Sequence, residues 1–179
     1  MRRVCALLLC GSLMLPSALA VSEPVWPQWA EGALSWSQEA SMDQALLLAP
    51  EKVVSRGVAA QLLYEAAGRP EVTSACPFSD VSGAYSDAVT WAAGQGYLTG
   101  VGDGRYEPER SVTRQEFAAI LWQRAGAPAV PDQGVARFQD AGAVAAWARE
   151  PVLWCLQAGV MSGRSADQLA PNGVITTAE

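Results

Sequence analysis

One arginine in this sequence occupies an electrostatically unfavourable place. Thr113 is followed three residues later by Glu116, which is the spacing of a helix capping box, so Arg114 is expected at the first helical position. This end of a helix carries a partial positive charge, and a cation there costs about 0.3–1 kcal/mol unless something compensates it. The residues leave two explanations open: Arg114 pairs locally with Glu107 or Glu109, or an anionic group such as a carboxylate binds there.

The overall composition excludes several kinds of chemistry. The chain has 179 residues, with 12 Lys and Arg against 18 Asp and Glu, and no histidine. A net negative surface repels nucleic acid and anionic lipid, so an acidic ligand must be held by a few placed arginines. The absence of histidine excludes Ser-His-Asp and Cys-His catalysis and removes the commonest metal ligand. We therefore expect no enzyme, no cofactor and no nucleic-acid partner.

Two weaker patterns leave that expectation in place. A glycan hydrolase remains an open alternative, because its two carboxylates can come from anywhere in a fold. Gly102-Asp103-Gly104 is similar to part of a calcium loop but lacks the earlier carboxylates, so we interpret it as a turn.

The N-terminus predicts export. Arg2 and Arg3 precede an apolar run that is too short to span a bilayer, and Ala18-Leu19-Ala20 is a small-x-small cleavage site. We expect a signal peptide over residues 1–20, cleaved after Ala20, and no membrane span afterwards. Its removal takes away two arginines and changes the formal charge from −6 to −8.

Two cysteines lie outside the signal peptide, Cys76 and Cys155. Export permits a disulfide between them, whereas the helical pattern around Cys155 favours a small buried residue. The second interpretation is the preferred one.

The rest of the chain repeats itself. The spacing between Gly68 and Gly126 also carries Arg56 onto Arg114, and the spacing between Gly96 and Gly159 carries later residues onto a third copy. We place the copies at residues 26–71, 76–128 and 136–179, the first degenerate and the third truncated. Each copy is expected to hold two helices around a glycine-rich loop, and such small units must pack on one another to bury their apolar faces.

The second copy shows the plan most fully. A helix is expected over residues 85–95, ending at Gly96 in the left-handed conformation. A second helix should follow Thr113 and stop at Gly126. We expect its inward face to consist of Phe117, Ile120, Leu121 and Ala125.

These patterns resemble S-layer homology domains. The resemblance rests on Phe-Ser-Asp-Val (78–81), Ala-Val-Thr-Trp-Ala-Ala (88–93), the loop over residues 100–108, and Val-Thr-Arg-Gln-Glu-Phe (112–117). It implies an all-α, mainly helical fold: a pseudo-threefold array of helix-loop-helix repeats around a central helical bundle. It also implies a secreted module on the bacterial cell wall, which binds secondary cell-wall polysaccharide noncovalently between its copies, often through a pyruvylated sugar.

The resemblance also suggests which residues bind the glycan. Arg114 and Arg56 are the candidates for holding the carboxylate of the sugar. Trp91 and Trp154 would pack against the sugar ring, or else belong to the core. Asp80 and Asp140 would accept sugar hydroxyl hydrogen bonds, or else cap the first helix of their copy.

The third copy departs from this plan. Thr177 stands where the other copies have arginine, so at most two grooves should bind well. Thr176 to Glu179 form another capping box at the end of the sequence, which suggests a truncated chain or a second exported protein that supplies the last helix. On either explanation we expect an apolar surface near Leu153, Leu156 and Ile175.

Overall fold

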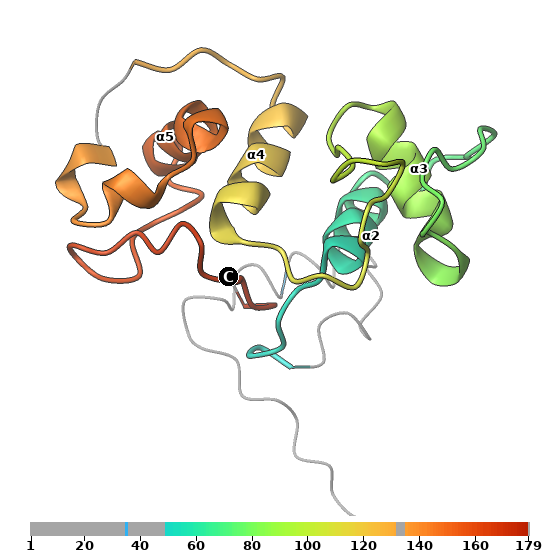
Figure 1. Ribbon diagram of the computed structural model, residues 1–179, viewed down its shortest axis with the longest axis horizontal. Coiled ribbons are helices and arrows are strands. Elements are labelled where there is room, and N and C mark those ends of the chain that lie inside the picture. Colours follow the sequence, from blue (N-terminus) through green and yellow to red (C-terminus); the bar gives the residue numbers. More distant parts are fainter. Residues whose placement is uncertain (1–34, 36–48, 132–134, 179) are drawn as a thin grey trace, which may run out of the picture.

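The computed structural model describes residue 35, residues 49–131 and residues 135–178. Four α-helices have bounds within these ranges: α2 (Arg56–Ala66), α3 (Ser86–Gly94), α4 (Arg114–Arg124) and α5 (Arg149–Gln157) (Figure 1). Single turns of 3-10 helix lie between them: η3 (Gly83–Tyr85), η4 (Val135–Arg137), η5 (Ala141–Ala143) and η6 (Ala146–Ala148). Extended pairing among the described residues is confined to isolated bridges, so the mainly helical prediction is confirmed. The expected signal peptide and residues 26–34 and 36–48 of the expected first copy lie outside the described residues.

The helix boundaries follow from local sequence. The Ser55 side chain accepts a hydrogen bond from the amide of Val58 at the start of α2. At the start of α4 the capping box between Thr113 and Glu116 is complete in both directions. Gly96 has a φ of 75° and ends the α3 segment in the left-handed conformation, as expected. These local signals determine where α2 and α4 begin and where α3 ends.

A closed ring of backbone hydrogen bonds joins three equivalent positions. The Val54 amide donates to the Ile175 carbonyl (3.0 Å), the Ile175 amide to the Val112 carbonyl (3.3 Å), and the Val112 amide to the Val54 carbonyl (3.0 Å). All three side chains are buried. The ring gives the described residues a pseudo-threefold centre from which α2 and α4 extend.

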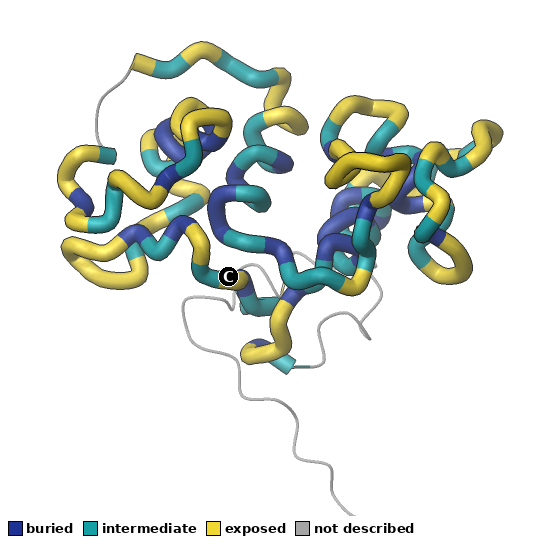
Figure 2. The backbone as a smooth tube through the Cα atoms, in the orientation of Figure 1, coloured by how far each residue is buried: buried dark blue, intermediate teal, exposed yellow. Residues whose placement is uncertain are grey.

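Helices pack between consecutive expected copies rather than within one. Helix α2 packs against α3, and α4 packs against α5. Figure 1 shows α4 between α5 and the α2/α3 pair. Ile120 of α4 belongs to the core around α2 and α3, while Ala118 of the same helix belongs to the core around α5. In Figure 2 buried residues accordingly occur along α4 and along the helices on both sides of it.

Some details of the predicted core were wrong. Ala125 is exposed, because it is the C-cap of α4 and lies beyond the last packed turn, whereas Ala118 is fully buried. Leu153 and Ile175 are only 2% and 4% exposed, so they do not form the expected apolar surface. Ile175 is buried because it belongs to the central ring.

Both cysteines in the described residues are free thiols, and Cys155 is the small buried residue that its helical pattern indicated. Its sulfur lies 3.7 Å from the Ala118 carbonyl oxygen and donates to it. None of the described helices is long and apolar enough to cross a bilayer.

Candidate functional site

Arg56 reaches from one copy into the glycine-rich loop of the next. Its Nε donates to the Tyr106 carbonyl and its Nη2 to the Thr99 carbonyl, both at 2.8 Å. The guanidinium carbon lies 4.4 Å from the centre of the Tyr106 ring, and the Tyr106 hydroxyl donates back to the Arg56 carbonyl at 2.8 Å. Burial raises the pKa of that hydroxyl to about 12, so it stays a neutral donor. The side chain of Arg56 thus links two copies.

Arg114 repeats this arrangement one copy further on. Its Nε donates to the Leu169 carbonyl at 3.1 Å, and its Nη2 donates to the Ser162 carbonyl. These two carbonyls stand at positions equivalent to those that Arg56 contacts. Glu107, one of the two local partners considered for Arg114, instead pairs with Arg110 at 3.2 Å.

The same loops also supply carbonyls to the exposed ends of the helices. In both copies the first two helical amides donate to the loop of the following copy. The four bonds are Arg56 to Arg110 (2.9 Å), Gly57 to Pro108 (2.7 Å), Arg114 to Gly173 (2.8 Å) and Gln115 to Pro171 (3.0 Å). Four carbonyl dipoles therefore compensate the positive ends of α2 and α4, which explains why a cation is tolerated there.

Asp80 and Asp140 hold the same loops from the other side. Both Asp80 oxygens accept backbone amides at 2.8 Å, one from Tyr106 and one from Glu107. Asp140 does the same for Leu169 and Ala170, at 2.8 and 2.7 Å. The amide of Tyr106 lowers the pKa of Asp80, and the amide of Leu169 lowers that of Asp140. Each loop peptide is therefore held at its N–H by aspartate and at its carbonyl by arginine.

The two predicted tryptophans pack mainly with the protein. Trp91 lies 5.7 Å from Tyr64 and 5.6 Å from Tyr97, measured between ring centres, and packs on the first core. Trp154 packs on the core around α5. Neither belongs to the two grooves described below, so a sugar-stacking role for either one stays a prediction.

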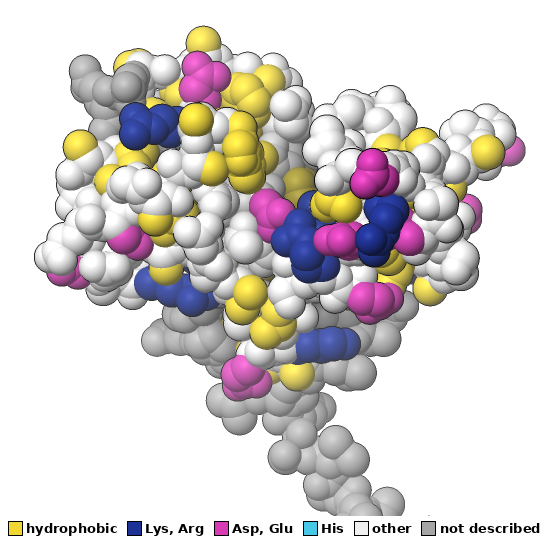
Figure 3. Space-filling view, in the orientation of Figure 1, with side chains coloured by type: hydrophobic (Ala, Val, Ile, Leu, Met, Phe, Trp, Pro, Cys, Tyr) yellow, Lys and Arg dark blue, Asp and Glu magenta, His cyan; other side chains and the backbone are white. Residues whose placement is uncertain are grey.

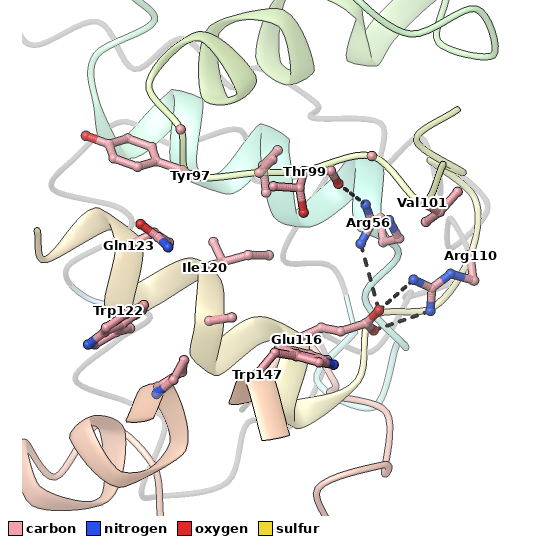
Figure 4. Close-up of a pocket in the computed structure, with 15 residues that line it drawn as sticks. Arg56, Tyr97, Thr99, Val101, Arg110, Glu116, Ile120, Trp122, Gln123 and Trp147 are labelled. Carbon is pink, nitrogen blue, oxygen red and sulfur yellow. Dashed lines mark hydrogen bonds and ion pairs between the residues drawn. The ribbon is translucent and has the colours of Figure 1, made fainter. Parts of the chain in front are cut away.

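Groove 1 is a pocket of about 350 Å³ that is lined by residues from all three expected copies (Figure 4). Its members come from α2, the segment after α3, the loop before α4, α4 itself, η6 and the start of α5. They are Arg56, residues 96–101, Arg110, Glu116, Ala119, Ile120, Trp122, Gln123, Trp147 and Pro151.

The charged side chains of groove 1 form one cluster. The Glu116 Oε1 atom lies 2.6 Å from Arg110 Nη2 and 3.9 Å from Arg56 Nη1, so one carboxylate oxygen faces two guanidiniums. Partial burial acts to raise the pKa of Glu116, but hydrogen bonds from Arg110 and Thr113 outweigh it and lower the pKa. Figure 3 shows charged side chains of both signs gathered over the middle of this face. The groove therefore carries two positive charges against one negative charge.

Planar side chains also line the groove. Trp147 is 58% exposed and lines the groove together with Trp122 and Gln123; in Figure 4 it lies by the Glu116 side chain. The indole nitrogen of Trp122 donates to the Pro128 carbonyl at 2.9 Å, which fixes the ring. The sequence analysis did not identify Trp147 as a site residue, because it comes from a different expected copy than the loop over residues 96–101 that lines the same groove.

Groove 2 is the equivalent pocket one copy further on, with a volume of about 510 Å³. The segment 159–164 takes the place of 96–101, and Arg114 takes the place of Arg56. Within the described ranges, no group of three His, Cys, Asp or Glu side chains is placed to hold a metal ion in either groove.

Comparison with known proteins identifies the repeated unit. The family model of the S-layer homology domain matches residues 77–118 and 137–179. These ranges contain the Asp80 and Asp140 loop contacts and most of both grooves.

Three relatives are similar over parts of the chain. Cell surface glycoprotein 1 of Acetivibrio thermocellus is 32% identical over 77 residues, which is 40% of this chain and 3% of that protein. Exoglucanase XynX of Acetivibrio thermocellus is 26% identical over 135 residues, 73% of this chain and 12% of that protein. The surface-layer 125 kDa protein of Lysinibacillus sphaericus is 28% identical over 102 residues, 57% of this chain and 8% of that protein. The chain thus spans only a small part of each of these relatives.

Proposed function

We propose, from the premise that this chain is an S-layer homology domain protein, that it attaches noncovalently to the bacterial cell wall by binding an acidic, pyruvylated secondary cell-wall polysaccharide. The match to the S-layer homology domain supports the more general role of a cell-surface anchoring module. Two of the relatives are named as cell-surface proteins, which agrees with that role. The enzyme-named relative shares only 12% of its length with this chain, so its activity does not transfer.

The composition of groove 1 supports a glycan ligand. Arg56 and Arg110 provide positive charge in a chain with a formal charge of −6. The exposed indole of Trp147 offers an apolar face with a polar edge, which suits a sugar ring. Gln123 and the Thr99 hydroxyl add hydrogen-bonding groups for sugar hydroxyls.

Arg56 and Arg114 therefore have two tasks in this proposal. Their side chains hold the loop that lines the groove: Nε donates to the carbonyl of Tyr106 or Leu169, and Nη2 donates to the carbonyl of Thr99 or Ser162. Their positive charge lies beside the groove and attracts the carboxylate of the ligand. Asp80 and Asp140 act indirectly, because both carboxylates already hold loop amides.

The architecture that we propose has three copies, at residues 26–71, 76–128 and 136–179, behind a signal peptide over residues 1–20. The ring of Val54, Val112 and Ile175 supports this division, because it joins one position from each copy. Export and the cell-wall location belong to the same proposal, as does an exported protein that binds beside the third copy.

A sedimentation pull-down with purified wall polysaccharide tests the glycan proposal. The informative variant is Trp147→Ala, because this exposed side chain lines groove 1 and contributes little to the core. The matched control is Val53→Ala, which truncates an exposed apolar side chain outside both grooves. We expect Trp147→Ala to lower retention on the polysaccharide by about tenfold, the scale of one lost aromatic contact, while Val53→Ala leaves it unchanged. Equal retention of all three proteins would show that groove 1 is not the binding site.

A further inference from the structure

Each groove contains a second arginine in addition to the one at the helix start. Groove 1 contains Arg110 beside Arg56, and groove 2 contains Arg164 beside Arg114. The second arginines do not occupy equivalent sequence positions. The repeat spacing places Gly173 at the position of Arg110, and it places Val101 at the position of Arg164.

The two second arginines nevertheless arrive at the same point of their copy. Arg110 Nη1 donates to the Ser111 carbonyl at 3.4 Å, and Arg164 Nη2 donates to the Val174 carbonyl at 2.5 Å. Ser111 and Val174 are equivalent in the repeat. One guanidinium thus approaches from the end of its loop, and the other from the beginning of its loop.

Gly173 makes room for this exchange. A Cβ atom at that position would lie 3.0 Å from Arg164 Nη1 and 3.4 Å from its Cζ. The guanidinium of Arg164 therefore lies over the backbone from which an arginine equivalent to Arg110 would project. The two copies thus place a guanidinium at the same point of the repeat from different sequence positions.

We propose that this second guanidinium is a specificity-determining element of each groove, and that it holds the acidic group of the glycan together with the arginine at the helix start. This inference rests on the proposed function. The Glu116 Oε1 atom illustrates the geometry, because it lies within reach of both Arg56 and Arg110. A carboxylate on a sugar in the groove meets the same pair of donors, whereas a neutral sugar gains nothing from the second one.

The chain itself provides the test. Arg110→Gly gives groove 1 the residue of the third copy, and the double variant Val101→Arg, Arg110→Gly transplants the complete arrangement of groove 2. Binding is measured by calorimetry with native wall polysaccharide and with the same polymer after chemical reduction of its carboxyl groups. Thermal unfolding of each variant monitors the fold.

We expect Arg110→Gly to weaken binding of the native polymer by about tenfold, the scale of one charge-assisted contact, and to leave binding of the reduced polymer unchanged. The double variant should recover to within about threefold of the wild type, since the charge returns to the same point. Arg164→Val should show the same selective loss at groove 2.

Other results overturn the inference in distinguishable ways. If wild type binds the native polymer and Arg110→Gly binds it equally well, the second guanidinium is not a determinant. If Arg110→Gly loses affinity equally for both polymers, the residue acts only through the fold. If the double variant does not recover, the exchange of positions has no binding role. Failure of the wild type to bind the native polymer at all refutes the proposed function itself, and this inference with it.

Discussion

The substitution Arg56→Met tests whether the arginine holds two copies together. Methionine keeps the apolar stem of the side chain but removes the guanidinium. Without the guanidinium, two carbonyl groups lose their charged hydrogen-bond donor. One belongs to Tyr106, which has no exposed surface, and the other to the exposed Thr99. The Thr99 carbonyl can turn to water, so only the Tyr106 contact counts fully.

The magnitude follows from these contacts. A buried hydrogen bond from a charged donor contributes about 1.5–3 kcal/mol. The contact with the Tyr106 ring, at 4.4 Å, adds roughly 0.5–1 kcal/mol. We therefore expect the free energy of unfolding to fall by roughly 2–4 kcal/mol. For a chain of this size, that change lowers the melting temperature by roughly 5–15 °C.

Thermal unfolding followed by circular dichroism is the assay. Arg124→Ala is the matched control, because it removes an exposed arginine from the last turn of α4 and should cost less than about 1 kcal/mol. If Arg56→Met melted within a degree of the control, Arg56 would not be holding the loop, and our account of the copy-to-copy contact would be refuted.

Three further predictions concern the loops and the thiols. The pKa of Asp80 is lowered in the folded protein, so its contribution to stability is present above the ordinary pKa of 3.8 and is lost as the pH falls through the lower folded pKa. Asp80→Asn should therefore make the melting temperature depend less on pH at the acid end of a pH profile. An unchanged acid dependence would contradict this. Gly100→Ala should lower the free energy of unfolding in urea by about 1–3 kcal/mol, because the new Cβ would lie 2.7 Å from the Arg105 carbonyl oxygen. The control Gly94→Ala places its Cβ in open space on a helix, so it should not destabilise the protein. Of the two cysteines in the described residues, Cys76 should react with a thiol reagent in the native protein and Cys155 should not, because Cys155 is fully buried and burial raises its pKa to about 12. Rapid labelling of Cys155 would show that the α4/α5 core is open.

Local sequence signals predicted the helices well. The capping box at Thr113, the place of Arg114 at the first helical position, and the left-handed Gly96 all depend on neighbouring residues, so they could be identified without a fold. The two matched repeats do pack on one another through α4 and α5, as the repeat spacing led us to expect.

The hydrogen-bond partners of the charged side chains could not be predicted from local sequence signals. Arg56 binds a carbonyl fifty positions away, and Asp80 binds the amide of Tyr106 twenty-six positions away. Both contacts depend on how one copy sits against the next loop, which no local pattern specifies. The same holds for Trp147, which completes groove 1 from the third copy. The helix start therefore indicated that Arg114 needs compensation, but not that carbonyl groups of the following loop provide it.

The most direct test of the central claim is a calorimetric titration of the full chain with native wall polysaccharide over a range of salt concentrations, alongside the carboxyl-reduced polymer. If guanidinium groups hold an acidic sugar, the native polymer should bind at least about tenfold more tightly than the reduced polymer. This difference in affinity should shrink as salt screens the charges. Equal affinities for the two polymers at every salt concentration would contradict the claim.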